Sequence, residues 1–332
     1  MFNFTKRGIL RIVSKHFLAA LLASLVLLVP ARAQLIVGNQ LALESNGGAA
    51  IQTNDFATGA LVASFVPTGA GTPGSGINSF GVETVGNIVY YTVASNAGVT
   101  DVIHVAPFNG GVGGADLRTF PNPVAGSAVT ALSYAAGVLY LLEFSPTAPV
   151  RVCGIDAGTG AVVRACVPIG GGAGAGGLAV LPNGNFLIGS AAGVYDQYNP
   201  STGAVIAGTT ITLSSLSLAV DTDGTSLFFS TRQCLDFLCQ SFADSYTKTD
   251  MLGNVVATRP ITPVSDSGGN HTLLVDISLL KLPGGTPGSA NCNGKTTSSL
   301  AKLYGGMPSA AAALGYPNVG ALQAAINTFC GN

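Results

Sequence analysis

Residues 177–206, with the sequence GLAVLPNGNFLIGSAAGVYDQYNPSTGAVI, decide the predicted fold. Short apolar runs such as LAVL and FLI alternate in this stretch with the turn sequences PNG and NPSTG. Glycine supplies the positive φ angle that tight turns need, so the stretch predicts two consecutive β-hairpins. Four short strands that recur together along a chain are typical of the blades of a β-propeller.

The same pattern recurs elsewhere in the chain. Matching first hairpins begin at residues 77, 127 and 215, and turns of second hairpins fall near residues 55–59, 108–111, 156–160, 199–203 and 250–254. The turn glycines of the first hairpins, spaced 51, 47 and 40 residues apart, are Gly86, Gly137, Gly184 and Gly224. Repeats of this length indicate an array of β-units, each of which needs its neighbours to bury both faces of its sheet.

The two ends of the array complement each other. Three strands are predicted from Leu35 onward without a first strand, and one strand is predicted from His271 without the rest of its blade. Pairing these segments closes the ring and removes sheet edges that otherwise promote aggregation. The sequence therefore predicts an all-β propeller with five blades, counting this composite one, and six or seven shorter blades are the alternative.

One segment resembles a known group of propellers. Residues 153–190, CGIDAGTGAVVRACVPIGGGAGAGGLAVLPNGNFLIGS, resemble the YVTN and NHL-like propellers of the SMP-30-like superfamily, in which an Asp-x-x-Thr-Gly turn precedes a strand pair. The resemblance extends over most of residues 35–282, but its motifs are turn chemistry, so it implies a fold and no particular activity. The chain has no Trp, which removes the WD-repeat signature and weakens a resemblance to propellers that bind quinone cofactors. We expect no cofactor.

The N-terminus has the three parts of a secretory signal. Residues 1–16 carry the basic residues Lys6, Arg7, Arg11 and Lys15. Residues 17–29 are apolar apart from Ser24, and Ala31 and Ala33 are the small residues that a signal peptidase needs. The alternative, a transmembrane anchor, needs about 20 apolar residues, and this run is shorter. We therefore expect a secreted or periplasmic protein that begins at Gln34 after removal of residues 1–33, with no membrane span in the mature chain.

The charge of the mature chain excludes some partners. Residues 1–33 contain five of the 14 Lys and Arg residues and none of the 15 Asp and Glu residues, which leaves nine basic against 15 acidic residues and a formal charge of −6. The remaining basic residues are scattered, so the chain has no electrostatic footprint for nucleic acid or anionic lipid. The partner, a protein or a small-molecule ligand, is not identified by the sequence.

Six cysteines in an exported chain indicate disulfides. Their positions predict three local pairs: Cys153–Cys166 across a hairpin, Cys234–Cys239 within one loop, and Cys292–Cys330 around the C-terminal segment. A metal site is the rival interpretation, but the chain has no Cys-x-x-Cys motif and no His near these cysteines.

The C-terminal segment changes from strand to helix composition. We expect the propeller to span residues 34–282, a Gly- and Pro-rich linker to span residues 283–291, and a small three-helix domain to span residues 292–332. Thr296 or Thr297 is the predicted cap of the first helix. About 40 residues make a small core, so the predicted Cys292–Cys330 disulfide is needed as a staple. The segment looks like the Cys-bracketed tails of some exported bacterial proteins.

Two functions from different classes fit the sequence. The first is a non-catalytic propeller that acts as a binding or surface-interaction scaffold. The second is a metal-dependent propeller of the lactonase or lyase kind, in which polar side chains at the starts of the inner strands converge on a metal. The candidate residues for such a site are Asn78, Asn270, His271, Glu44 and Asp266. The alternative is that these residues simply end strands, as polar residues commonly do.

We predict the scaffold, because the chain is poor in titratable groups. The mature chain has two His residues and no Gly-x-Ser-x-Gly motif, and its glycine-rich connectors have few groups that could transfer a proton. The segment from Asp221 to Gly224 has the first half of a calcium loop, but Arg232 stands where the bidentate acid is needed. We interpret this segment as a plain turn. No catalytic residue and no metal ligand are assigned.

Overall fold

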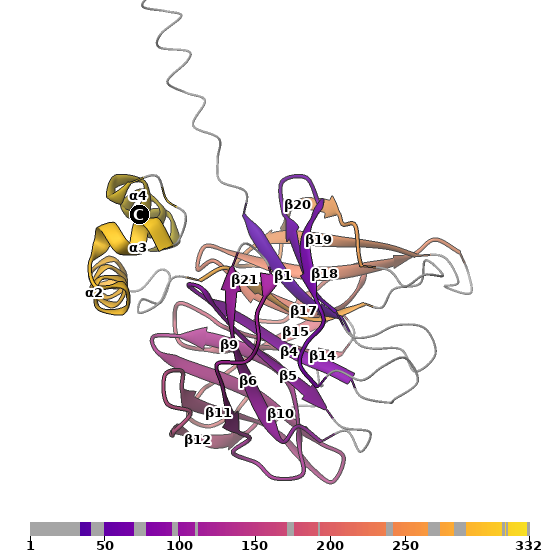
Figure 1. Ribbon diagram of the computed structural model, residues 1–332. Helices are drawn as coiled ribbons and strands as arrows, with labels where there is room; N and C mark the ends of the chain where they lie inside the picture. The colour runs from indigo at the N-terminus through magenta and orange to yellow at the C-terminus, as the bar shows by residue number, and fades with distance from the viewer. Residues whose placement is uncertain are drawn as a thin grey trace, which may run out of the picture. The chain divides into compact units, whose positions relative to one another are not determined.

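The computed structural model describes residues 34–40, 50–69, 78–94, 99–109, 112–170, 176–191, 193–236, 242–264, 273–281, 290–313, 316 and 318–330. In this part of the chain, strands form five sheets and three helices follow toward the C-terminus (Figure 1). The innermost strands of the five sheets contact one another in a closed ring, in the order β21, β4, β9, β13, β17 and back to β21. The predicted five-bladed propeller is confirmed.

Each blade is an antiparallel sheet whose strands follow one another from the axis outward. Blade 1 consists of β21 (Leu274–Leu279), β1 (Leu35–Gln40), β2 (Ile51–Asp55) and β3 (Leu61–Phe65). Blade 2 consists of β4 (Asn78–Val85), β5 (Ile88–Ala94) and β6 (Val102–Asn109), with β7 (Val112–Gly113) and β8 (Arg118–Pro121) both paired to β6. Blade 3 consists of β9 (Ala128–Ala135), β10 (Val138–Ser145), β11 (Ala148–Asp156) and β12 (Val162–Pro168).

The last two blades follow the same plan. Blade 4 consists of β13 (Gly176–Val180), β14 (Phe186–Ala191), β15 (Val194–Tyr198) and β16 (Ile211–Thr212). Blade 5 consists of β17 (Leu216–Thr222), β18 (Ser226–Cys234), β19 (Phe242–Asp250) and β20 (Val255–Pro260). Apolar side chains of neighbouring blades share buried clusters, as Ile103 of blade 2 does with Leu139 of blade 3.

Blade 1 closes the ring. Strand β1, the first of the described chain, pairs antiparallel with β21, the last, from Ile36 opposite Leu279 to Asn39 opposite Asp276 (Figure 1). The predicted pairing of the two chain ends is therefore confirmed. Closure leaves no open gap between the first and last blades, which is how a propeller limits exposed sheet edges.

Side chains link the inner strands, whose facing edges belong to different sheets. Asp276 Oδ2 accepts from the backbone N–H groups of Val82 (2.8 Å) and Leu132 (2.9 Å), in the next two blades. Further bonds of this kind join Glu83 to the N–H of Tyr134, Ser133 to that of Val180, and Asp221 to that of Leu279. A buried N–H group without a partner is costly, so these side chains stabilise the ring at its centre.

Glycines dock the outer turns of one blade on the preceding blade. Gly203, with φ 67°, lies so close to blade 3 that an added Cβ would be 1.8 Å from the carbonyl oxygen of Pro168. Gly59 has the same relation to Pro260 of blade 5, also at 1.8 Å. The turns containing them begin with Asp55 and Asn199, whose Oδ1 atoms accept two backbone N–H bonds each. The repeated turn sequence thus also sets the distance between blades.

The C-terminal segment forms three helices, α2 (Cys292–Tyr304), α3 (Met307–Ala313) and α4 (Val319–Cys330). They share a small buried cluster that includes Leu300, Leu322 and Ile326. The predicted linker and domain boundaries fall largely on residues 282–289, which lie outside the described residues. In the described part of the chain, no helix is long and apolar enough to cross a bilayer.

The predicted start of the first of these helices is wrong. Helix α2 begins at Cys292 after Asn291, whose φ is 66°, and no side chain caps it. Thr296 is fully buried inside the helix instead of at its start, and its Oγ1 lies 4.0 Å from the sulfur atoms of both Cys292 and Cys330. The disulfide holds the first turn of α2 in place, so this helix begins without a threonine cap.

Two predicted disulfides are present. Cys153 and Cys166 are bonded across β11 and β12, and Cys292 and Cys330 are bonded between α2 and α4. Cys234 is also disulfide-bonded, while its predicted partner Cys239 lies outside the described residues. Disulfides are typical of proteins that fold in an oxidising compartment.

Candidate functional site

The two ends of the propeller differ in their connections. Several long connections, among them residues 41–50, 66–77 and 261–273, join strand ends that lie where the inner strands begin. At the opposite end the connections are mostly short turns, such as residues 86–87, 136–137 and 223–225, with residues 199–210 as an exception. We call the first end the loop face. Binding residues in rigid scaffolds usually come from such loops and the strand ends that hold them.

Of the five predicted site residues, Asn78 alone lies among the described residues. Asn78 is the first residue of β4, so its backbone lies at this end as expected. Glu44, Asp266, Asn270 and His271 lie outside the described residues. Among the residues that are described, no three His, Cys, Asp or Glu side chains are placed to hold a metal ion. Whether the five residues converge stays a prediction.

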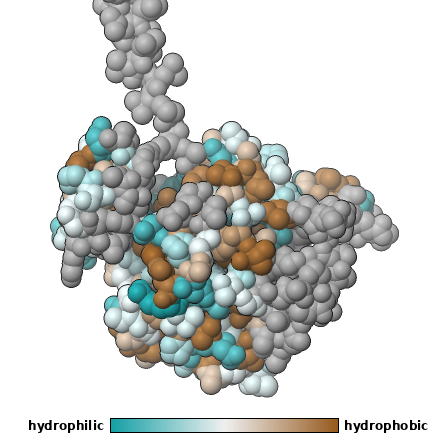
Figure 2. Space-filling model, viewed as in Figure 1, coloured by the Kyte–Doolittle hydropathy of each residue, from teal (hydrophilic) through white to brown (hydrophobic). Residues whose placement is uncertain are grey.

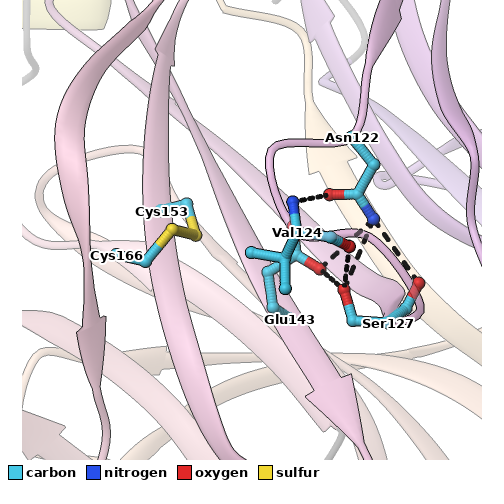
Figure 3. The surroundings of a disulfide bond; sticks show 6 residues. All are labelled: Asn122, Val124, Ser127, Glu143, Cys153 and Cys166. Atoms are coloured by element: carbon cyan, nitrogen blue, oxygen red, sulfur yellow. Dashed lines mark hydrogen bonds between the residues drawn. A yellow bond between two sulfur atoms is a disulfide. The ribbon is translucent and has the colours of Figure 1, made fainter.

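A polar cluster occupies the loop face of blade 3 (Figure 3). Ser127, just before β9, donates a short hydrogen bond to Oε2 of Glu143, near the end of β10. The side-chain amide of Asn122 lies 3.4 Å from the same oxygen and donates to the carbonyl of Thr100 at 2.8 Å. Both Ser127 and Glu143 are buried, and the other carboxyl oxygen of Glu143 has no partner among the described residues.

Burial raises the pKa of Glu143 to about 7, although the bonds from Ser127 and Asn122 and the charge of Arg151 act in the opposite direction. A carboxyl with this pKa could transfer a proton near neutral pH. However, Glu143 is 1% exposed and Ser127 2%, so neither is presented to a solute. The cluster therefore fastens the start of β9 to the end of β10. Sequence reasoning missed it, although an acid inside the apolar run LYLLEF was a signal.

A second cluster lies in blade 2. Nδ1 of His104 on β6 lies 2.8 Å from Oδ2 of Asp116, and the hydroxyl of Tyr91 on β5 donates to Oδ1 of Asp116 at 2.7 Å. The rings of Tyr91 and His104 are stacked, with centroids 4.8 Å apart. Burial raises the pKa of Tyr91 to about 12, so the phenol stays neutral and donates a hydrogen bond to Asp116. This arrangement fixes the segment that carries Asp116 against blade 2.

A third cluster lies among the inner strands. Nζ of Lys281, just after β21, lies 2.6 Å from Glu83 on β4 and 2.8 Å from Asp221 on β17. Ser278 also donates to Glu83, at 2.7 Å. Burial raises the pKa of Glu83 to about 7, and the nearby Lys281 opposes this shift. All three charged groups are buried, so the cluster joins blades and does not meet a ligand.

Asp221 and Asp223 have different roles in the segment predicted as a turn. Asp223 Oδ1 accepts from the N–H groups of Thr225 (2.9 Å) and Ser226 (2.7 Å), as in an ordinary turn. Asp221 instead points inward and accepts from Lys281. The plain turn is therefore the correct interpretation for Asp223, while Asp221 belongs to the central ion pair.

A pocket of about 210 Å³ lies at blade 5, near the start of β17. It is lined by one face of β18, β19 and β20 and by residues 213–215, which lead from blade 4 to β17. Most of the lining side chains carry a hydroxyl or an amide, and none of them is titratable: Ser214, Ser215, Thr231, Gln233, Ser245 and Thr247 are examples. Most of the lining residues lie toward the loop face, at the end of β18 and the start of β19, whereas Val255 begins β20 at the opposite end.

The outer surface is mixed in polarity. Figure 2 shows hydrophobic patches interspersed with hydrophilic ones on the viewed face. The described outermost strands carry exposed apolar pairs, namely Leu61 and Val62 on β3, Val162 and Val163 on β12, and Val255 and Val256 on β20. Scattered exposed apolar residues are normal on a protein surface.

Comparison with known proteins identifies no family. No protein family matches the sequence, and no curated protein matches it. A crystal structure of a protein of unknown function from Bacteroides caccae is similar with a TM-score of 0.41 at 11% identity, covering 74% of this chain and 98% of that one. A bifunctional GH43-CE protein of Bacteroides eggerthii has a TM-score of 0.42 at 11% identity, covering 55% of this chain and 27% of that one. The resemblance to the YVTN and NHL-like propellers is supported only as far as the five-bladed fold of this chain.

Proposed function

We propose that the protein is an exported, non-catalytic propeller that binds its ligand at the loop face. The observation that carries this proposal is the pocket beside β17, whose lining offers hydrogen-bonding groups and no titratable side chain. A binding site needs such groups, whereas a catalytic site needs groups that can move protons or hold a metal. The signal-like residues 1–33 and the disulfides support export.

The test uses the mature chain, residues 34–332, labelled with a fluorophore and applied to arrays of oligosaccharides and peptides. We expect at least one class of ligand to be retained. Hydrogen exchange of the complex should then show protection in residues 213–215, at the end of β18 and at the start of β19, and unchanged exchange in the turns at residues 136–137 and 223–225. Protection confined to those turns, or no retention on any array, would contradict the proposal.

A parallel assay addresses the enzymatic alternative. The mature chain is incubated with the lactone dihydrocoumarin in the presence of Ca²⁺, Mn²⁺ or Zn²⁺. We expect no hydrolysis above the metal-only control. Hydrolysis that is lost in Asn78→Ala or His271→Ala, with the fold intact by circular dichroism, would replace the scaffold function by the lactonase-like one.

A further inference from the structure

We propose that the pocket of blade 5 binds a short, uncharged saccharide. The inference rests on the proposed binding function and adds the chemical class of the ligand. It follows from three properties of the pocket: hydroxyls without a hydrogen-bond partner among the described residues, a rigid row of threonines, and a neutral lining that includes apolar side chains.

The first property is the supply of hydrogen-bonding groups. Within the described residues, the side chains of Ser214, Ser215, Gln233 and Ser245 make no hydrogen bond. They include both donors and acceptors, because each hydroxyl and the amide can act as either. A saccharide hydroxyl also donates and accepts, so these groups complement it without a change of protonation.

The second property is a rigid row of threonines. Oγ1 of Thr231 on β18 lies 3.0 Å from Oγ1 of Thr247 on β19, and Oγ1 of Thr247 lies 3.5 Å from Oγ1 of Thr258 on β20. Thr231 also donates to the carbonyl of Ser245 at 3.1 Å. Hydroxyls held on three paired strands lose little conformational entropy on binding, which favours a weak polar ligand.

The third property is the neutral lining. Arg232 and Asp244 precede or follow lining residues but pair with each other, through Nε to Oδ1 and through Nη2 to Oδ2, both at 2.7 Å. An anionic or cationic ligand would lose hydration in the pocket without gaining an opposite charge. Leu213, Ala243 and Val255 add apolar contact for the C–H groups of a sugar ring.

The size of the pocket limits the ligand. Sites for drug-sized molecules are about 300–1,000 Å³. The pocket, at about 210 Å³, is smaller, so we infer that one sugar ring enters it and that the rest of the ligand lies outside. None of the described lining residues is aromatic, so we expect modest affinity that depends on hydroxyl contacts.

The experiment measures binding of maltotriose, cellotriose, xylotriose and trigalacturonate to residues 34–332 by calorimetry and ligand-observed NMR. We expect at least one neutral trisaccharide to bind more tightly than trigalacturonate. The variants Ser245→Ala and Thr247→Val each remove one hydroxyl and should weaken that binding about two- to tenfold, since one hydrogen bond contributes about that factor. The control Thr119→Val changes an exposed strand threonine of β8, in another blade, and should leave Kd unchanged.

A third variant, Ala243→Phe, fills the pocket and guards against misfolding of the buried Thr247→Val. It should abolish binding while circular dichroism and the unfolding temperature stay near those of the parent. Tighter binding of trigalacturonate, unchanged affinity in Ser245→Ala and Ala243→Phe, or no binding of a neutral trisaccharide would overturn the saccharide assignment. If the saccharide assignment fails but an array ligand of another class still slows hydrogen exchange at the loop face, the proposed binding function stands. If no ligand is found at all, the saccharide assignment and the proposed binding function are both wrong.

Discussion

At the scale of single residues, the propeller is held together by polar side chains that reach from one inner strand to the next. Asp276 is the clearest case, because one of its carboxyl oxygens accepts from two blades while the other has no partner among the described residues. Burial raises the pKa of Asp276 well above its usual value, against the lowering effect of these two bonds. Burial therefore disfavours the charged form of Asp276, while its bonds to Val82 and Leu132 need only an acceptor oxygen.

This leads to a prediction for two substitutions at Asp276. Asp276→Asn keeps an oxygen for both N–H groups and should change the free energy of unfolding little, or raise it. Asp276→Ala leaves two buried N–H groups unpaired and should lower it by about 2–4 kcal/mol. Urea unfolding followed by circular dichroism measures both. Equal losses in the two variants would mean that the charge of Asp276, and not its acceptor oxygen, is what stabilises the ring.

Glu143 gives a prediction about pH. Its pKa is raised to about 7 in the folded state, above the usual 4.5, so the folded protein binds this proton more tightly than the unfolded chain does. The corresponding stability is fully present below about pH 4.5 and is lost as the pH rises through 7. Glu143→Gln keeps an acceptor for Ser127 but does not titrate. We expect the fall in stability between pH 5 and pH 8 to be smaller in this variant by roughly 2–3 kcal/mol.

Thermal or urea unfolding of parent and variant at both pH values is the measurement. Glu83 also has a raised pKa and remains in the variant, so a residual pH dependence is expected. Identical pH dependence in the two proteins would show that Glu143 is ionised in the folded state, contrary to the effect of its burial.

At the scale of the element, the recurrent outer turn has two functions. It reverses the chain, and its glycine lets the turn lie against the preceding blade. Gly203 has both a positive φ and a close neighbour, the carbonyl oxygen of Pro168, whereas Gly208 in the same blade has φ 77° and nothing within 4 Å of an added Cβ. Alanine at Gly208 would introduce backbone strain alone, whereas alanine at Gly203 would introduce backbone strain and a steric clash with the preceding blade. Comparing the two substitutions therefore measures the clash.

We predict that Gly203→Ala lowers the free energy of unfolding by about 2–4 kcal/mol and Gly208→Ala by about 1 kcal/mol. Both are measured by urea unfolding of the mature chain. If the two substitutions cost the same, the turn does not set the distance between blades and the glycine serves only the positive φ.

The C-terminal helices give a further prediction at this scale. The Cys292–Cys330 disulfide closes a loop with a sequence separation of 38, which is worth about 4 kcal/mol in the chain-entropy model. Cys330→Ser in a Cys292→Ser background should speed hydrogen exchange throughout α2 and α4. Exchange in β9 and β10 should stay unchanged, because those strands have their own core. Faster exchange in both regions would mean that the helices and the propeller unfold together.

The strands and helices could largely be predicted from sequence, because their signals lie within short stretches of the chain. Turn glycines such as Gly137 and Gly224 mark hairpins, and the apolar runs between them are too short for helices. The start of α2 could not be predicted, because the disulfide and not a threonine cap fixes it. A turn near residues 108–111 was predicted and is the β6–β7 hairpin, but the presence of two short strands, β7 and β8, was not predicted, since strands of two and four residues leave no periodic pattern.

At the scale of the whole molecule, the closed ring was predictable, but the side chains at its centre were not. The sequence predicted an incomplete blade near each end of the propeller, and together the two make one complete blade. In contrast, Lys281 pairs with Glu83 and Asp221, which are 198 and 60 residues away in sequence. Nothing in the local sequence indicates such a contact. It depends on which inner strands are neighbours and on the position of each strand along the propeller axis relative to the next. The pocket of blade 5 was missed for a similar reason, since its serines and threonines come from four separate segments.

The central ion pair gives a prediction for the ring as a whole. Lys281→Met leaves the carboxyls of Glu83 and Asp221 buried without their cation and should lower the free energy of unfolding by about 3–5 kcal/mol. Adding Glu83→Gln and Asp221→Asn removes the unpaired charges and should restore part of this loss. Urea unfolding of the single and triple variants decides the matter. A triple variant no more stable than Lys281→Met would show that packing of the lysine chain, and not charge, is responsible.

The pairing of β1 with β21 also makes closure of the ring depend on residues that are synthesised late. The strand that completes blade 1 is the last strand among the described residues, so a product that stops before residue 274 cannot form the closed ring seen here. Such a product leaves one edge of β1 unpaired and deprives β4 and β17 of Asp276 and Lys281. Open edges and unpaired buried groups make a chain prone to proteolysis and aggregation. A chain that lacks β21 is therefore expected to be less stable than one that includes it, because it cannot complete blade 1.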